Sequence, residues 1–131
     1  MEELAETSGG GGCATNQVLY NLTRRGIEFD LIPWCRAQKM PIMAYSPIEQ
    51  GRMLGHAALR EVAGRHKATP AQVALAWLMR QDGVIAIPKA IALAHVEEDI
   101  AALDLRLTAD DLATLDRAFP PPKKATSLDM L

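Results

Sequence analysis

A strand-then-helix pattern that occurs three times is the feature that most constrains the fold of this sequence. Short segments at residues 13–20, 41–46 and 84–88 are strand candidates, and the last two are largely apolar, as buried strands are. Residues with helical spacing follow each of them, so strands and helices alternate along the chain. This alternation predicts right-handed βαβ units and a parallel sheet. The segment 41–46 is apolar on both faces, which favours a sheet that is covered on both sides.

Capping signals place the helices between and after these strands. Thr69 and Pro70 have the residue types of an N-cap and a first helical position, and Thr108 and Asp111 have the spacing of a capping box. The last helix must end before the three prolines at 120–122, which force an extended segment. The predicted helices span residues 27–39, 57–66, 69–82, 92–103 and 108–119.

We expect one domain over residues 1–131. Within it, residues 1–12 are predicted to be the remnant of a helix followed by a glycine hinge, because four consecutive glycines hold neither helix nor strand well. Residues 13–119 form the βα units, and residues 120–131 form a C-terminal tail. A chain of 131 residues is long enough to bury a core.

Composition excludes several classes of protein. With 23% charged residues and a net charge of −2, the chain has no basic surface that would suit a nucleic acid. Its longest apolar run is too short to span a membrane, and the acidic N-terminus does not have the pattern of a signal peptide. Cys13 and Cys35 fit no metal-binding spacing, so we expect free thiols in a reducing compartment and a cytoplasmic protein.

Candidate ligand-binding groups follow each strand. In a parallel sheet of either the doubly wound or the β/α-barrel type, ligands gather at the carboxyl ends of strands, which here are residues 17–21, 45–52 and 88–90. No GxGxxG follows any strand, which weighs against the doubly wound dinucleotide fold. The stretch Val84–Asp99 combines a strand end, Lys89 and a helix start, which together suit a phosphate. The alternative is an ordinary βα turn with a solvated lysine.

These strand ends carry a resemblance to a known family. The segments NQVLYN (16–21), PIMAYSPIEQGRM (41–53), TPAQVALAWLM (69–79), IPKAIALAHVEED (87–99) and LTADDLATLDRAFP (107–120) resemble the aldo-keto reductases, above all their bacterial members. The resemblance implies a (β/α)₈ TIM barrel that reduces aldehydes and ketones with NADPH. It extends from Thr15 nearly to the end of the chain, so the fold class we expect is α/β, a partial barrel of about three parallel strands with flanking helices.

The resemblance assigns the nicotinamide end of the cofactor to the first two strand ends. It implies that Gln17 contacts the nicotinamide amide and that the Tyr45 ring stacks on the nicotinamide. Ser46, Ile48 and Gln50 would line the pyrophosphate, although Ile48 and Gln50 depart from the family's usual residues. An aromatic face suits this role because it offers stacking area to a planar ring.

The third strand end is assigned to the adenosine end of NADPH. Lys89 and Ala90 match the Lys-Ser pair that takes the adenosine 2′-phosphate, but Ala90 lacks the hydroxyl. His95 replaces a frequent arginine, and Glu98 and Asp99 match positions near the adenine. The predicted cofactor-binding residues at this end are Pro88, Lys89, Ala90, His95, Glu98 and Asp99.

The family's catalytic tyrosine, lysine, aspartate and histidine belong to strands that precede this part of the barrel. We therefore expect the chain to be a C-terminal barrel part that begins inside the fifth helix, has no catalytic residue of its own and has little reductase activity. Tyr20, aided by Lys89 or His56, could substitute as an acid only if the fold brought these residues together, and nothing in the sequence indicates this. The alternatives are a non-catalytic nucleotide-binding module and a self-assembling partial barrel.

Two open sheet edges predict association, either with a second copy or with a complementing barrel fragment. The remaining candidate residues receive structural interpretations. We expect His56 and His66 to be solvated or to cap helices, and the pair Arg24-Arg25 to be solvated in a loop. Trp34 and Trp77 stand at core spacing on their helices and are expected to pack there.

Overall fold

The computed structural model describes residues 3, 6–9 and 12–131. The helix remnant and the glycine hinge that we predicted for residues 1–12 lie partly outside these residues and stay predictions.

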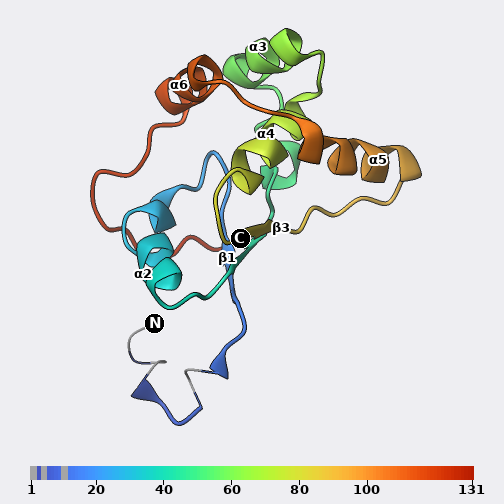
Figure 1. Ribbon diagram of the computed structural model, residues 1–131. Coiled ribbons are helices and arrows are strands. Elements are labelled where there is room, and N and C mark those ends of the chain that lie inside the picture. Colours follow the sequence, from blue (N-terminus) through green and yellow to red (C-terminus); the bar gives the residue numbers. More distant parts are fainter. Residues whose placement is uncertain (1–2, 4–5, 10–11) are drawn as a thin grey trace.

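A three-stranded parallel sheet lies at the centre of the fold (Figure 1). Its strands are β1 (Asn16–Leu19), β2 (Ile42–Tyr45) and β3 (Val84–Ala86), and they are adjacent in the order in which they occur in the chain. The register aligns Gln17 with Met43 and Met43 with Ile85. The predicted parallel sheet is therefore confirmed, with strands shorter than the apolar segments that predicted them.

The two faces of the sheet are buried to different extents. Because side chains alternate along a strand, Val18, Ile42 and Ala44 share one face, and they belong to the hydrophobic core. Gln17 and Ile85 share the other face, where Ile85 remains 47% exposed. In a closed β/α barrel this second face would point into the interior. The sheet is thus covered on its helix side and partly open on the other, which differs from the two-sided cover that we expected.

The first helical region differs from the single predicted helix at 27–39. A short 3₁₀ helix, η2 (Gly26–Glu28), precedes α2 (Leu31–Ala37). The Asp30 carboxylate accepts a hydrogen bond from the backbone N–H of Leu31 and so starts a new helix. Helical spacing of apolar residues continues across this break, which is why the periodicity predicted one helix.

Helices α3 (Ala57–His66) and α4 (Pro70–Met79) lie where the sequence placed them. The Thr69 hydroxyl accepts from the Gln72 N–H, and the Gln72 side chain accepts from the Thr69 N–H, which completes a capping box. Trp77 is fully buried, as predicted, whereas Trp34 packs only partly buried against the core. The helix ends three residues earlier than predicted, at Met79.

The third strand leads into α5 (Leu93–Ala101), the 3₁₀ turn η4 (Ala102–Asp104) and α6 (Ala109–Ala118); a further 3₁₀ turn, η3 (Glu49–Gly51), follows β2. The predicted capping box of Thr108 and Asp111 is present. Helix α6 packs beside α3, whereas α5 extends away from the body of the molecule (Figure 1).

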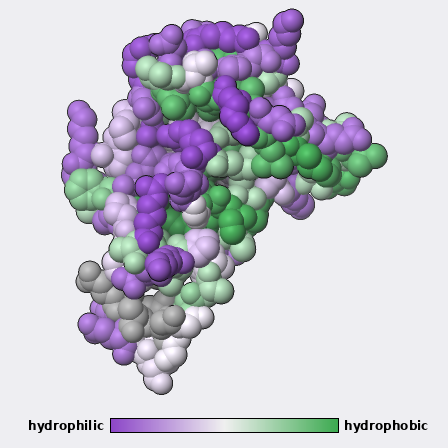
Figure 2. All heavy atoms as spheres, in the orientation of Figure 1, coloured by the Kyte–Doolittle hydropathy of each residue, from purple (hydrophilic) through white to green (hydrophobic). Residues whose placement is uncertain are grey.

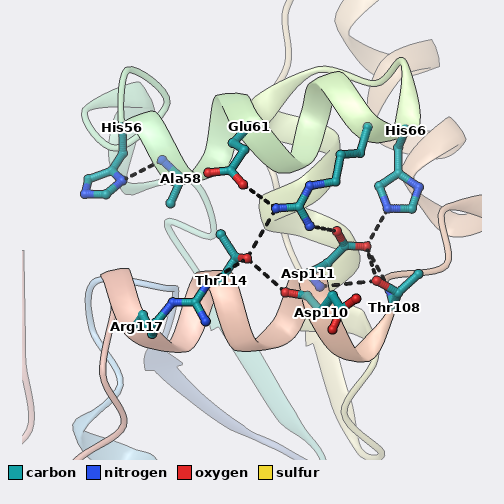
Figure 3. A network of polar contacts seen from close by, with 10 residues as sticks. His56, Ala58, Glu61, His66, Thr108, Asp110, Asp111, Thr114 and Arg117 are labelled. Atoms are coloured by element: carbon teal, nitrogen blue, oxygen red, sulfur yellow. Dashed lines mark hydrogen bonds and ion pairs between the residues drawn. The ribbon is translucent and has the colours of Figure 1, made fainter.

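A polar network joins α6 to α3 (Figure 3). Asp111, which is 1% exposed, accepts from Thr108, contacts His66 at 2.6 Å and pairs with Arg65 at 2.7 Å. Burial acts to raise the pKa of Asp111, but the hydrogen bonds from His66 and Thr108 outweigh it and lower that pKa to about 2. The prediction that His66 is solvated or caps a helix is therefore wrong, because its ring is hydrogen-bonded to Asp111 on another helix. His56 does cap α3, through Nδ1 and the N–H of Ala58.

The prediction of a solvated Arg24-Arg25 pair is also wrong. Arg25 is buried, where it pairs with Glu28 and Asp116 and donates to the carbonyl of Phe119. The Arg25 guanidinium also lies 5.0 Å from the centroid of the Trp77 ring. A charged pair in a loop gave no sign that later parts of the chain would fold over it.

Hydrophobic side chains remain exposed over α5, and Figure 2 shows them as a patch at the side of the molecule. Leu93 is 73% exposed and Ile100 is 60% exposed. None of the described residues of α5 is buried. Among the described residues, no helix is long and apolar enough to cross a membrane.

Candidate functional site

The carboxyl ends of the three strands meet at one edge of the sheet, because the strands are parallel and adjacent. The register pairs Gln17 with Met43 and Leu19 with Tyr45, so Gln17 and Tyr45 project from the same face of the sheet. Gln17 is exposed and Tyr45 is half-buried. An amide and an aromatic ring are therefore accessible on one face, next to the edge where the loops begin.

The loop after β2 has an unusual backbone. Ser46, Glu49 and Gln50 have φ angles of 48°, 49° and 56°, and Gly51 has a φ of 84°. Residues other than glycine in this left-handed region are unfavourable by roughly 1–2 kcal/mol each, so side-chain contacts must hold the loop in this form. Within the described part of the chain, the backbone N–H groups of Ile48 and Gln50 have no hydrogen-bond acceptor.

Asn21 and Glu49 provide these contacts. The Asn21 amide nitrogen donates to the carbonyl of Ser46 at 2.9 Å and to Glu49 Oε2 at 2.8 Å. Glu49 Oε1 accepts from Arg24 at 3.2 Å and from Arg52 at 3.4 Å. Burial acts to raise the pKa of Glu49, but the hydrogen bonds from Asn21 and Arg24 outweigh it, so the pKa lies below its ordinary value. The buried Glu49 side chain is thus held as a carboxylate inside the loop.

The end of β3 presents a free lysine and an uncapped helix. Lys89 is exposed, and no acidic side chain in the described parts of the chain pairs with it. Ala92 precedes α5 and makes no side-chain capping bond, whereas His56, Thr69 and Thr108 cap α3, α4 and α6. Among the described residues, the N–H groups of Leu93 and Ala94 have no acceptor, so they and the positive end of the α5 dipole stay available close to Lys89.

The other predicted residues of this end fall into two groups. Pro88, Ala90 and Asp99 line a cavity of about 400 Å³ between α4, β3 and α5, whose walls are mainly apolar. Burial and the neighbouring Glu98 raise the pKa of Asp99, and His95 opposes them. His95 is exposed and does not line the cavity, and the carbonyl of Glu98 accepts from the Gln72 side chain.

Tyr20 is not available as a substitute acid at this edge of the sheet. Its hydroxyl is buried, donates to Glu28 Oε1 at 2.8 Å and also contacts the Gln81 amide. Burial and Glu28 raise the pKa of Tyr20 far above its ordinary value, so the phenol does not act as an acid. The described residues also contain no group of three or more His, Cys, Asp and Glu side chains that could hold a metal ion.

Sequence reasoning missed Asn21 and Glu49. The usable signal was position: Asn21 closely follows one strand and Glu49 closely follows the next, and parallel strand ends meet at one edge. Nothing in the sequence showed that Glu49 turns inward, since an acid in a polar loop is ordinarily solvated.

Three consecutive parallel βα units, with their polar groups at the carboxyl edge, define the molecule as part of a (β/α)₈ barrel. The family model described as the aldo/keto reductase family matches residues 1–119. The chain belongs to the aldo/keto reductase family, as its sequence motifs suggested.

Several of the proteins similar to this chain are bacterial reductases. The chain is 52% identical over 136 residues to methylglyoxal reductase YeaE of Escherichia coli K12, covering 100% of this chain and 48% of that protein. It superposes with a TM-score of 0.96 and 47% identity on an aldo/keto reductase from Klebsiella pneumoniae in complex with NADP and acetate, covering 99% of this chain and 48% of the other. A second structure of a Klebsiella pneumoniae aldo-keto reductase, with NADPH, matches equally well. The chain thus spans about half the length of these relatives.

Proposed function

We propose that these 131 residues supply the NADPH-binding end of the active site of a carbonyl reductase that acts on small aldehydes such as methylglyoxal. One observation carries the proposal. Lys89, which pairs with no described acidic side chain, the uncapped start of α5 and the accessible Gln17 and Tyr45 all belong to the carboxyl edge of the same parallel sheet. The NADP- and NADPH-containing structures of Klebsiella pneumoniae relatives support the choice of cofactor.

The adenosine end of the cofactor would bind at the end of β3. Lys89 and the free N–H groups of α5 suit the 2′-phosphate, because both present positive charge to a dianion. Ala90 adds no hydroxyl here, so the lysine and the helix start would have to provide most of the attraction. The cavity lined by Pro88, Ala90 and Asp99 offers apolar surface to the adenine.

The nicotinamide end would bind across β1 and β2. Tyr45 offers its ring to the nicotinamide, and Gln17 offers its amide to the carboxamide. Ser46 and the free N–H groups of Ile48 and Gln50 suit the pyrophosphate. NADPH, when bound, supplies the hydride, and these residues orient it.

The proton for the carbonyl oxygen would come from elsewhere. Tyr20 is buried and engaged with Glu28, so it does not offer a proton at this edge. We therefore expect the 131 residues alone to bind NADPH and to turn over methylglyoxal slowly or not at all, since loss of a general acid alone lowers rates by about 10²- to 10⁴-fold.

We further propose that the chain associates through its open sheet edges and the exposed side chains of α5, with a second copy or with a complementing barrel part. Ile85, Leu93 and Ile100 are all more than 40% exposed, and edge strands offer unpaired N–H and C=O groups. Sedimentation velocity at micromolar concentration tests this, and a compact monomer would contradict it.

The binding proposal is tested by titrating NADPH and NADH into the chain and following nicotinamide fluorescence. Lys89→Gln should weaken NADPH binding by about tenfold or more and leave NADH unchanged, because hydrogen bonds between charged groups are worth about 1.5–3 kcal/mol. Lys39→Gln is the matched control, because Lys39 is also exposed but precedes β2 at the opposite edge. Equal NADPH affinity in both variants would contradict the assignment of Lys89.

A further inference from the structure

The loop at 46–51 depends on a buried polar side chain from a different strand end. Asn21 is fully buried, and its amide uses its whole hydrogen-bonding capacity. The amide oxygen accepts from the Thr23 N–H at 2.9 Å, the Thr23 hydroxyl at 2.8 Å and the Arg24 N–H at 3.1 Å. The amide nitrogen donates to the Ser46 carbonyl and to Glu49. Neither an aspartate nor a reversed amide could meet all these partners.

Glu49 links the same loop to two arginines. One carboxylate oxygen accepts a hydrogen bond from the Asn21 amide, and the other accepts hydrogen bonds from Arg24 and Arg52. The three charged groups sum to one positive charge. An anion that approaches the loop therefore meets a neutralised Glu49 and the exposed guanidinium of Arg52, which has 59% of its side chain accessible.

The geometry of the loop explains why such an anchor is needed. Ser46, Glu49 and Gln50 are all left-handed without being glycine. The backbone N–H groups of Ile48 and Gln50, which have no acceptor among the described residues, flank Glu49. If Glu49 were released, these residues would relax toward right-handed or extended angles, and the two N–H groups would no longer keep their arrangement.

We propose that Asn21 and Glu49 are positioning residues for cofactor binding: they hold the loop 46–51 so that the N–H groups of Ile48 and Gln50 stay available to the pyrophosphate. This inference rests on the proposed function. Neither residue touches the cofactor; each acts through the backbone of the loop.

The test compares two ligands. NADPH contains the pyrophosphate, whereas adenosine 2′-monophosphate contains only the adenosine end. Glu49→Gln should weaken NADPH binding by about tenfold, since it removes a charged hydrogen-bond acceptor, and should leave the affinity for adenosine 2′-monophosphate within about twofold. Glu61→Gln is the matched control, because Glu61 also pairs with an arginine but lies on the exposed side of α3.

Asn21→Asp is the second variant, and it should show the same selective loss because its carboxylate cannot donate to Ser46. Hydrogen exchange without ligand gives an independent readout: the amides of Gly51 and Arg52, which donate to the carbonyls of Ile48 and Glu49, should exchange faster in Glu49→Gln than in Glu61→Gln. Unchanged exchange would contradict the anchor.

The outcomes separate this inference from the proposed function. If the unaltered chain binds neither ligand, the proposed function fails and this inference fails with it. If the unaltered chain binds both and Glu49→Gln binds NADPH equally well, only the positioning role is overturned. A loss of both ligands in Glu49→Gln would mean a general structural defect and would also overturn it.

Discussion

Helices α5 and α6 are both amphipathic, but they end up in opposite environments. Helix α6 buries Asp111, Thr114 and Leu115 against the molecule, whereas none of the described residues of α5 is buried. Helix α6 also begins with a complete capping box, and α5 begins at Ala92 with no side-chain cap. The difference teaches that burial depends on whether a partner surface is present, and not only on the pattern of the helix.

The largest expected contrast is between two apolar truncations. Leu115→Ala should lower the free energy of unfolding by about 4 kcal/mol, because Leu115 is fully buried and its removal leaves a cavity. Ile100→Ala on α5 should lower it by about 0.5 kcal/mol or less, since that side chain is mostly exposed. Urea denaturation of both variants measures the contrast, and similar losses would show that α5 is packed in solution.

Asp111 tests the polar side of the same comparison. Asp111→Ala should lower the free energy of unfolding by about 3 kcal/mol, because His66 and Arg65 lose their buried partner and α6 loses its capping box. The neighbouring Asp110→Ala is the control, since Asp110 is exposed and contributes only its carbonyl to the network. Thermal unfolding should separate the two variants, and equal melting temperatures would rule out a structural role for the network.

Acid should weaken the α3–α6 contact through Asp111. The pKa of Asp111 is lowered from 3.8 to about 2, so its contribution is fully present above about pH 4 and is lost as the pH falls toward 2. That loss amounts to about 2 kcal/mol. Unfolding measured between pH 5 and pH 2 should show it in the unaltered chain, while Asp111→Asn should show a flatter profile over the same range.

The smallest expected effect is a gain. Ala92→Ser should add the missing N-cap to α5 and raise the stability of that helix by about 1 kcal/mol, because Ala92 already has the extended backbone of an N-cap residue. Hydrogen exchange of the α5 amides measures this, with Ala94→Ser inside the helix as the control. If Ala92→Ser gave no added protection, the start of α5 would already be satisfied in solution.

Local sequence signals, such as caps and apolar spacing, predicted the fold well. They did not predict the polar contacts between residues far apart in the sequence. The capping boxes at Thr69 and Thr108 and the three strands were readable because each depends on residues close together in the sequence. The break at Asp30 was missed because apolar spacing continues across it.

The candidate site was predictable to a similar degree. Lys89 and the helix that follows it lie where the motif placed them, at the carboxyl edge. The contacts that bury Glu49 and Arg25, and the contact between His66 and Asp111, join residues 25 or more positions apart, except for the local Arg25–Glu28 and Glu49–Arg52 pairs. No periodicity or cap reports such contacts.

The agreement between spatial and chain order in the sheet has a consequence for folding. Since β1 pairs with β2 and β2 with β3, each strand pairs with the strand that is next to it in the chain. Every pairing in this sheet can therefore form between neighbouring segments. A barrel built in this way can be divided between units without rearranging the strands that remain, which agrees with a 131-residue chain that superposes on half of a whole reductase with a TM-score of 0.96.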